Sequence, residues 1–224
     1  MLPDFPKVKC PFVRKHYAVN KDDWKKHGAA MGLREPSVYL ATPEVEPGYE
    51  WVLEDKDTIA VEKLHGSNLC IETEGGRIKS IQNRRNVVDP YQLKGGKGFL
   101  VESVLMAIGK DYVKDDAAQY GEALGPKLNG NMYKLPYHLW YPFDNRKSLQ
   151  YTSFNKYGRS YDNLGVWFQF HLRSIFYCRF HKLPLMSADA PFAEGVIFYN
   201  GTKMAKLRRD MFPWFYQDKI RIEG

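Results

Sequence analysis

The sequence predicts an α+β fold with mainly antiparallel sheets and flanking helices. Short runs rich in β-forming residues recur along the chain and are bounded by Gly, Pro or Asn, which is typical of short strands. Helical patterns are inserted among them without the regular alternation of a parallel βαβ protein. With 224 residues, 44% of them hydrophobic, the chain can bury one good core, so we expect a single domain over residues 1–224.

The strands are predicted from residue type and from the turns that separate them. The run at 58–64 is rich in β-formers, and two more runs follow it at 69–74 and 77–82. Gly75 and Gly76 stand between the last two runs and indicate a hairpin. Three further strands are expected at 119–124, 138–143 and 195–199.

Helices are predicted in two places. Val101, Val104, Leu105 and Ile108 have the i, i+3, i+4, i+7 spacing of an amphipathic helix. The aromatic-rich segment 165–181 has an ambiguous period, and we favour helix with its rings in the core. The remaining expectations are a polar loop at 145–165, short strands and loops in the proline-interrupted segment 1–50, and an N-terminal extension of unassigned role at 1–57.

Composition narrows the class of partner. Lys and Arg number 33 against 26 Asp and Glu, and the resulting net charge of +7 favours an anionic partner such as nucleic acid or nucleotide. A solvated basic face would give the same count. No stretch approaches the ~20 apolar residues that span a bilayer. We therefore expect a soluble cytoplasmic protein with no membrane partner, in the host cytoplasm if the protein is viral.

Cysteine and histidine spacing argues against two kinds of site. The three cysteines are odd in number and show no CxxC spacing, and the six histidines show no metal-ligand spacing. Neither a disulfide framework nor a structural zinc site is therefore indicated.

Lys63 is the candidate for covalent chemistry. It ends the predicted strand 58–64 and enters a tight turn that contains Gly66, within the sequence VEKLHGSN at 61–68. A lysine amine attacks only when it has lost its proton, which neighbouring cations or burial favour. The candidate cations are Lys206, Arg208 and Arg209. Taken alone, a K-x-H-G tetrapeptide is more commonly a solvated lysine beside a turn histidine.

Five further short elements follow this one in order. They are QNRRN at 82–86, YGEALG at 120–125, LWYPFD at 139–144, AEGVIF at 193–198 and MAKLRRD at 204–210. Together with VEKLHGSN they resemble the six collinear motifs of the covalent nucleotidyltransferase superfamily, which contains DNA ligases, RNA ligases and mRNA capping enzymes. His65 and Asn68 look like the phage-type branch that seals nicked duplex RNA.

The resemblance implies an ATP-grasp-like ligase adenylation domain and an ATP-dependent RNA ligase that works in RNA repair. It implies ATP with Mg²⁺ or Mn²⁺ as cofactors, and RNA with 5′-phosphate and 3′-hydroxyl ends as substrate, with end-healing enzymes as possible partners. Only 18 residues follow Lys206. We therefore expect the catalytic domain without the further C-terminal domain that such ligases usually carry.

The resemblance also implies a role for each matching residue. Lys63 attacks the α-phosphate of ATP and becomes lysyl-AMP, with Lys206 and Arg208 as the paired cations of the last motif. Glu62 contacts the adenine side of the nucleotide, and His65 and Asn68 complete the first motif. The other cofactor-binding candidates are Arg84 or Arg85 for phosphate, Glu122 for the ribose, Phe143 for stacking on adenine with Tyr141 and Trp140 as alternatives, and Glu194 for the metal.

Proteins with other functions could carry the same residues. A capping-type enzyme would load GMP from GTP, a DNA-joining enzyme would use the same lysine, and NAD could replace ATP. An inactive protein of this fold could bind nucleic-acid ends without forming an adenylate. Considered singly, Glu122 and Glu194 could be ordinary strand-edge carboxylates and Phe143 a core residue.

Overall fold

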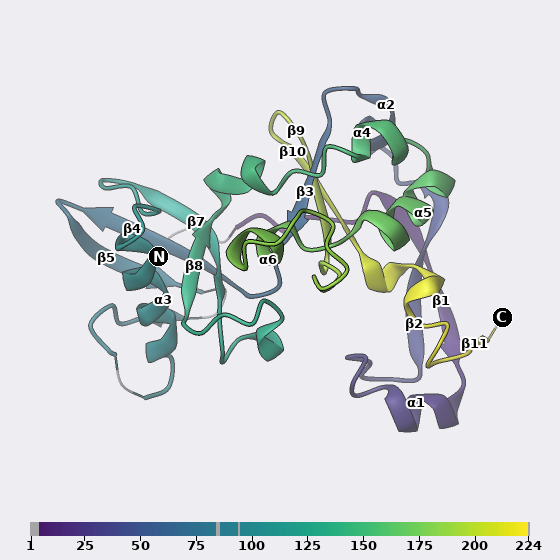
Figure 1. The fold of residues 1–224 in the computed structure, drawn as a ribbon, viewed down its shortest axis with the longest axis horizontal. Coiled ribbons are helices and arrows are strands. Elements are labelled where there is room, and N and C mark those ends of the chain that lie inside the picture. The colour runs from purple at the N-terminus through teal and green to yellow at the C-terminus, as the bar shows by residue number, and fades with distance from the viewer. Residues whose placement is uncertain (1–4, 84–85, 94, 224) are drawn as a thin grey trace. The chain divides into compact units, whose positions relative to one another are not determined.

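The computed structural model describes residues 5–83, 86–93 and 95–223 and divides the chain into two compact units (Figure 1). Both units combine helices with sheets, and every strand pairing described is antiparallel, which confirms the predicted fold class. Unit 1 is Met1–Lys7, Leu64–Leu149 and Phe176–Pro184, and unit 2 is Val8–Lys63, Gln150–Ile175 and Leu185–Gly224. Each unit is built from several segments that are distant in the sequence, so neither unit is a continuous stretch of chain. The single domain expected over residues 1–224 stays a prediction.

Unit 1 is built on a five-stranded sheet. Its strand order is β6-β5-β4-β7-β8. The strands are β4 (Ser67–Glu74), β5 (Arg77–Gln82), β6 (Val87–Val88), β7 (Ala118–Leu124) and β8 (Leu139–Pro142). Gly75 and Gly76 form the β4–β5 turn with φ of 57° and 73°, the left-handed values that a two-residue hairpin turn needs. The predicted hairpin is therefore confirmed.

Helix α3 (Gly98–Ile108) packs on β7 and β8 and confirms the predicted helix. Its buried face differs from the predicted one. Val101 and Val104 are buried, but Leu105 and Ile108 are 45% and 42% exposed. Leu100 and Ala107 are buried instead. The buried face of the helix is therefore turned about the helix axis relative to the predicted one, from positions 105 and 108 to positions 100 and 107.

The rest of unit 1 consists of short helical turns. These are η1 (Asn129–Asn131), η2 (Phe143–Leu149) and α6 (Ile175–Phe180), the last of which begins at the boundary with unit 2. Tyr133 and Tyr141 each pack edge-on against Phe176, with ring centroids 5.0 Å and 5.3 Å apart. These contacts fix α6 against β8.

Unit 2 contains two three-stranded sheets. The first has the order β11-β1-β2 and consists of β1 (Phe12–Val19), β2 (Ser37–Val45) and β11 (Ile222–Glu223). The second has the order β10-β9-β3 and consists of β3 (Ile59–Lys63), β9 (Gly195–Asn200) and β10 (Lys203–Arg208). In the first sheet β11, near the end of the sequence, pairs with the end of β1 through Ala18 and Val19.

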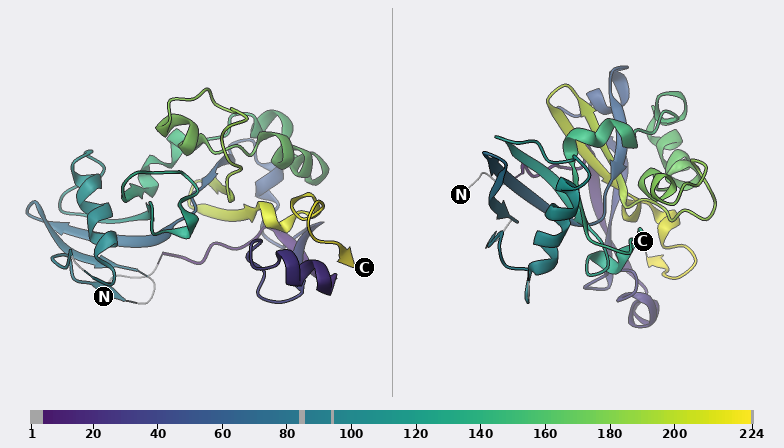
Figure 2. Two further views of the ribbon diagram at one scale, coloured as in Figure 1. Left: turned by 60° about the horizontal axis from the view of Figure 1, so that its bottom comes forward. Right: turned by 60° about the vertical axis from the view of Figure 1, so that its left-hand side comes forward.

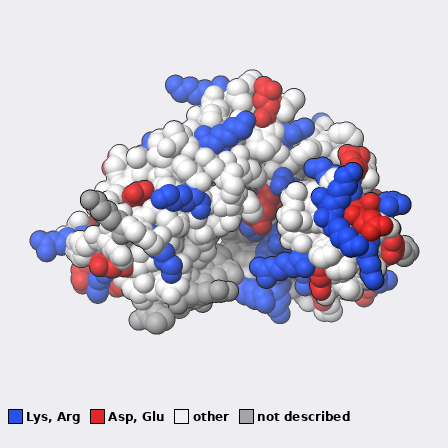
Figure 3. All heavy atoms as spheres, turned by 90° about the horizontal axis from the view of Figure 1, so that it is seen from below, with Lys and Arg blue, Asp and Glu red and all other residues white. Residues whose placement is uncertain are grey.

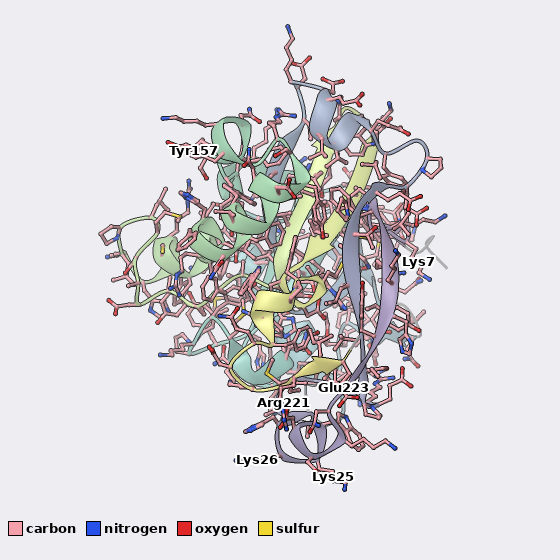
Figure 4. The ribbon with its side chains drawn as sticks, turned by 90° about the vertical axis from the view of Figure 1, so that its right-hand side faces the viewer. Lys7, Lys25, Lys26, Tyr157, Arg221 and Glu223 are labelled. Carbon is pink, nitrogen blue, oxygen red and sulfur yellow. The ribbon has the colours of Figure 1, made fainter. Side chains whose placement is uncertain are left out.

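Helix α1 (Lys21–His27) corrects the expectation that residues 1–50 contain only strands and loops. The Asn20 side chain accepts hydrogen bonds from the backbone N–H groups of Asp22 and Asp23 and so caps the helix. Arg221 binds the Asp23 carboxylate, with Nε 2.8 Å from Oδ2. Figure 4 shows Arg221 and Glu223 beside this helix, and in Figure 2 (left) the chain end lies next to it.

Helices α2 (Trp51–Glu54), α4 (Phe154–Tyr157) and α5 (Tyr161–His171) complete unit 2 with η3 (Arg209–Met211) and η4 (Pro213–Phe215). The loop predicted at 145–165 is wrong, since η2, α4 and the start of α5 lie there. The single helix predicted at 165–181 is two, because the chain leaves α5 at Leu172 and re-enters a helix at Ile175.

Two aromatic side chains of α5 lie in the core of unit 2, as expected from the sequence, and a third does not. Trp167 and Phe168 are fully buried, and Trp167 packs edge-on against Phe154 at 5.7 Å. Phe154 in turn contacts Phe198 of β9 at 5.2 Å. Phe170 points outward and is 64% exposed. Among the described residues, no helix has the length and apolar character needed to cross a membrane.

Candidate functional site

Lys63 lies at the end of the β3 edge strand in unit 2. It pairs with Gly195 of β9, and Gly195 pairs with Arg208 of β10. Lys206 pairs with Ile197, two residues further along β9. Because residues paired across a sheet share a face and alternate residues along a strand do too, Lys63, Lys206 and Arg208 project from one face. This agrees with the expectation that the two cations of β10 share a face.

Glu194 contacts Lys63. Its Oε2 accepts a hydrogen bond from the Lys63 Nζ at 2.6 Å, and the two side chains are 18% and 21% exposed. Glu194 lies one residue before β9. Gly195 is required beside it, because a Cβ there would clash with the Leu207 carbonyl oxygen and lie 2.7 Å from the Arg208 Cα. The close approach of β10 thus fixes the carboxylate at the strand end.

Asp210 is a residue that the sequence patterns did not single out. Its carboxylate lies 2.8 Å from the Arg208 guanidinium. Burial raises the pKa of the Asp210 carboxyl, and the positive charge of Arg208 opposes that shift. The adjacency of Arg208, Arg209 and Asp210 along the chain is the one local signal of this contact.

Arg209 contacts a backbone carbonyl and an aromatic ring of unit 2. Its guanidinium donates a 2.6 Å hydrogen bond to the Phe192 carbonyl and lies 5.1 Å from the centre of the Phe215 ring. These contacts give it a structural role in unit 2. The wider basic surface is dispersed, and lysine and arginine side chains are scattered over the face drawn in Figure 3.

Glu62 occupies the opposite face of β3 from Lys63. Strand alternation turns its side chain into the interior, where it is 4% exposed. Its Oε1 accepts a 2.6 Å hydrogen bond from the Ser174 hydroxyl, which is itself fully buried. A buried carboxylate needs such a partner. Its predicted contact with adenine stays a prediction, and Ser174 is a partner that the sequence did not reveal.

The first-motif turn in unit 1 is closed by Glu122. The Gly66 N–H donates to Glu122 Oε1 at 3.0 Å, and Asn68 pairs with Glu122 across β4 and β7. The His65 N–H donates to the Tyr133 hydroxyl at 2.8 Å. A Cβ at position 66 would clash with the Ala123 carbonyl oxygen. Glycine is therefore needed for this close approach of the turn to β7.

Phe143 is the most exposed of the three candidates for stacking on adenine. Trp140 is fully buried and donates to the Leu69 carbonyl, which makes it a core residue. Tyr141 is 8% exposed. The Phe143 ring itself is in contact with Phe5, whose centroid lies 4.9 Å away. Phe5 thus covers part of the ring that was predicted to stack on adenine.

Two candidate residues, Arg84 and Arg85, lie outside the described residues. Among those described, no group of three or more His, Cys, Asp and Glu side chains could hold a metal ion. Glu194 supplies the carboxylate in contact with Lys63, and the Asp210 carboxylate contacts Arg208 of the same face. One carboxylate fits a hard cation such as Mg²⁺ that takes its other ligands from phosphate and water.

Comparison with known proteins gives distant structural likenesses. No protein-family model matches the chain, and no curated protein does. The Naegleria gruberi RNA ligase with PPi is 13% identical, with a TM-score of 0.46, over 96% of this chain and 63% of that chain. A variant of that ligase with ATP and Mn is 14% identical, with a TM-score of 0.43, over 74% and 53%.

A further variant of the same ligase, without ligand, is 12% identical, with a TM-score of 0.45, over 96% of this chain and 64% of that chain. The chain thus covers less than two thirds of these ligase chains. At TM-scores below 0.5 such a likeness assigns neither a function nor a residue. The case for function therefore rests on the residues of this chain.

Proposed function

We propose that the protein is an ATP-dependent RNA ligase that carries AMP on Lys63. The observation that carries this proposal is the arrangement at the end of β3. A partly exposed lysine shares a sheet face with Lys206 and Arg208 and contacts the carboxylate of Glu194. Nucleotidyl transfer needs a nucleophile beside fixed cations and a carboxylate that can hold a metal.

Three transfers make up the proposed reaction. The Lys63 Nζ attacks the α-phosphorus of ATP, the bond to the pyrophosphate oxygen breaks, and a phosphoramidate to AMP forms. The 5′-phosphate of the RNA then attacks this AMP and regenerates the amine. The 3′-hydroxyl attacks the activated 5′-phosphate, AMP leaves, and a phosphodiester remains. Lys206 and Arg208 stabilise the negative charge that develops on phosphate oxygens.

Glu194 holds the Lys63 amine in place before nucleotide arrives, through the 2.6 Å contact. A bound Mg²⁺ or Mn²⁺ supplies positive charge for the phosphates, and Glu194 is the residue that would hold it. Competition between the ammonium and the cation for one carboxylate would release the ammonium from Glu194, and loss of its proton to solvent, which the neighbouring cations favour, would leave the amine free to attack.

The remaining roles follow the sequence resemblance. Glu122 binds the ribose, and its bond to the Gly66 N–H places that carboxylate beside the motif turn. Phe143 stacks on adenine. Arg84 or Arg85 binds phosphate. RNA with 5′-phosphate and 3′-hydroxyl ends is the proposed substrate, with end-healing enzymes as partners in RNA repair.

The first step is tested by intact mass spectrometry. Wild type is incubated with Mg²⁺ and each of ATP, GTP or NAD, and the covalent adduct is measured before and after addition of pyrophosphate. A pyrophosphate-reversible AMP adduct formed from ATP is expected, absent in Lys63→Ala. Lys203→Ala is the matched control, since Lys203 is an exposed lysine of the same sheet.

Adduct from GTP alone would assign a capping-type enzyme, and salt-sensitive RNA binding without any adduct would assign an end-binding protein. The joining step is tested with nicked RNA, nicked DNA and single-stranded RNA that carry 5′-phosphates. Sealing of RNA, with little or none of DNA, is expected. Equal sealing of nicked DNA would contradict the RNA assignment.

A further inference from the structure

A cavity lies wholly within unit 1, beside β8. It has a volume of about 570 Å³, which is within the range of small-molecule sites. Leu139 and Tyr141 of β8 line it together with residues of η2 and α6. Of the described residues named above for nucleotidyl transfer, only Tyr141, an alternative to Phe143 for stacking on adenine, lines it. The cavity is therefore a candidate for a separate binding site.

Aromatic rings form much of the cavity wall. Tyr141 packs edge-on against Phe176 and Tyr112, with centroids 5.3 Å and 5.5 Å apart, and Tyr137 packs edge-on against Phe180 at 5.9 Å. Tyr112, Tyr137 and Phe180 remain partly exposed. Rings held edge-on by their neighbours can present a face to a planar ligand. Stacking on such rings is how proteins hold nucleobases without sequence preference.

Three cations stand at the cavity. Lys110, Lys147 and Arg179 are exposed, and no described carboxylate forms an ion pair with any of them. The carboxylate of Asp144 also lines the cavity, but Lys114 already binds it at 2.6 Å. The charge left for a ligand is thus positive, and that favours a phosphate.

We propose that this cavity binds one nucleotide of the RNA strand, with its base against the aromatic wall and its phosphate at Lys147 and Arg179. The combination of stacking surface and uncompensated cations matches a nucleotide better than an apolar ligand or a simple anion. This inference rests on the proposed function, because the cavity would bind the RNA substrate of the proposed ligase reaction. Tyr141 precedes Phe143 by two residues, so the cavity and the candidate for stacking on adenine are close together in the sequence.

The test compares two doubly substituted proteins. Lys147→Ala/Arg179→Ala removes two charges at the cavity, and Arg77→Ala/Lys127→Ala removes two charges from exposed positions of the same unit outside it. Binding of a fluorescent single-stranded RNA with a 5′-phosphate is measured by anisotropy over a range of salt concentrations. Lysyl-AMP formation is measured on the same samples by intact mass.

The cavity variant is expected to bind RNA about 10-fold more weakly than wild type, with a salt slope reduced by about 0.7 for each lost phosphate contact. The control should bind RNA closer to the wild-type value. Lysyl-AMP formation should be unchanged in both. Phe180→Ala should weaken RNA binding by a further route, roughly 10-fold, through lost stacking.

Equal RNA affinity of the cavity variant and the control would overturn the proposal. A parallel loss of lysyl-AMP formation in the cavity variant would also overturn it, because the cavity would then serve ATP. If wild type forms no lysyl-AMP, the proposed function fails. The RNA-binding comparison would still judge the cavity by itself.

Discussion

Replacement of Gly66 by alanine tests the turn that carries the first motif. An added Cβ would clash with the Ala123 carbonyl oxygen and lie 2.8 Å from Leu124 Cδ2 and 2.9 Å from Glu122 Cγ. The backbone of β7 cannot yield as a flexible side chain can, so the turn must move. That movement also lengthens or breaks the 3.0 Å hydrogen bond from the Gly66 N–H to Glu122.

The two effects can be given magnitudes. Overpacking costs about 1–3 kcal/mol, and loss of a hydrogen bond to a charged group costs about 1.5–3 kcal/mol. A destabilisation of about 3–5 kcal/mol is expected, with allowance for partial relaxation. For a chain of this size each kcal/mol lowers Tm by about 2–4 °C. Gly66→Ala should therefore lower Tm by roughly 6–20 °C.

Thermal unfolding followed by circular dichroism measures this shift. Gly109→Ala is the matched control, because the nearest atom to its added Cβ, the Met106 carbonyl oxygen, lies at 3.7 Å. Its Tm should stay within about 2 °C of wild type. A Gly66→Ala protein that melts with the control would refute the close approach of the turn to β7. Lysyl-AMP formation at a temperature where both proteins are folded then tests whether the same turn positions the chemistry.

Three further outcomes are expected. Arg221 lowers the pKa of the Asp23 carboxyl to about 2, so their contact should stabilise the protein fully above the ordinary Asp pKa of about 4 and lose this effect as pH falls to about 2. The difference in the free energy of urea unfolding between wild type and Asp23→Asn should shrink as pH falls through that range. A difference that stays constant would contradict this contact. Phe5→Ala should tighten ATP binding, measured by calorimetry, roughly 2- to 12-fold, because the substitution uncovers the Phe143 ring. Weaker binding would contradict this and would mean that Phe5 holds the Phe143 ring in position. Trp167→Ala should cost about 3–5 kcal/mol in urea unfolding while Phe170→Ala on the same helix changes little, and similar losses would contradict the orientation of α5.

Features encoded by a few adjacent residues could be predicted from the sequence. Gly75 and Gly76 specify their hairpin turn because their φ values are open to glycine at no steric cost. Strand alternation alone is enough to place Lys206 and Arg208 on one face of β10. The capping signal of α1, Asn20 followed by Asp22 and Asp23, is equally local, but the surrounding prolines favoured strands and loops in its place.

Features held by distant contacts could not be predicted in this way. Helix α4 has four residues, too few for a periodic pattern, and burial of Phe154 against Trp167 and Phe198 holds it in place. The prolines predicted only short strands in this segment, yet Pro43 lies within the nine-residue strand β2, which is an edge strand of its sheet. A proline is tolerated there because an edge strand need not donate every N–H.

Contacts between residues that are distant in the sequence also explain why some residues near the candidate site were not predicted. Ser174 lies 112 residues from Glu62, and no pattern near either residue announces their hydrogen bond. Phe5 reaches Phe143 from the N-terminal extension, to which the sequence assigned no role. Motif spacing finds residues that act on a common ligand. It does not find the partners that hold them.

Glu62 and Lys63 show how such a partner bears on chemistry. Consecutive strand residues face opposite ways, so the buried Glu62–Ser174 bond anchors one side of β3 while Lys63 stands on the other. Misplacement of a nucleophile by about 1 Å can cost about 100-fold in rate. The order of the two residues also matters. Exchanging them would put an ammonium where a buried carboxylate accepts from Ser174, and a second carboxylate against Glu194. The order Glu62–Lys63 is therefore needed to keep the buried anchor on one face of β3 and the proposed nucleophile on the other.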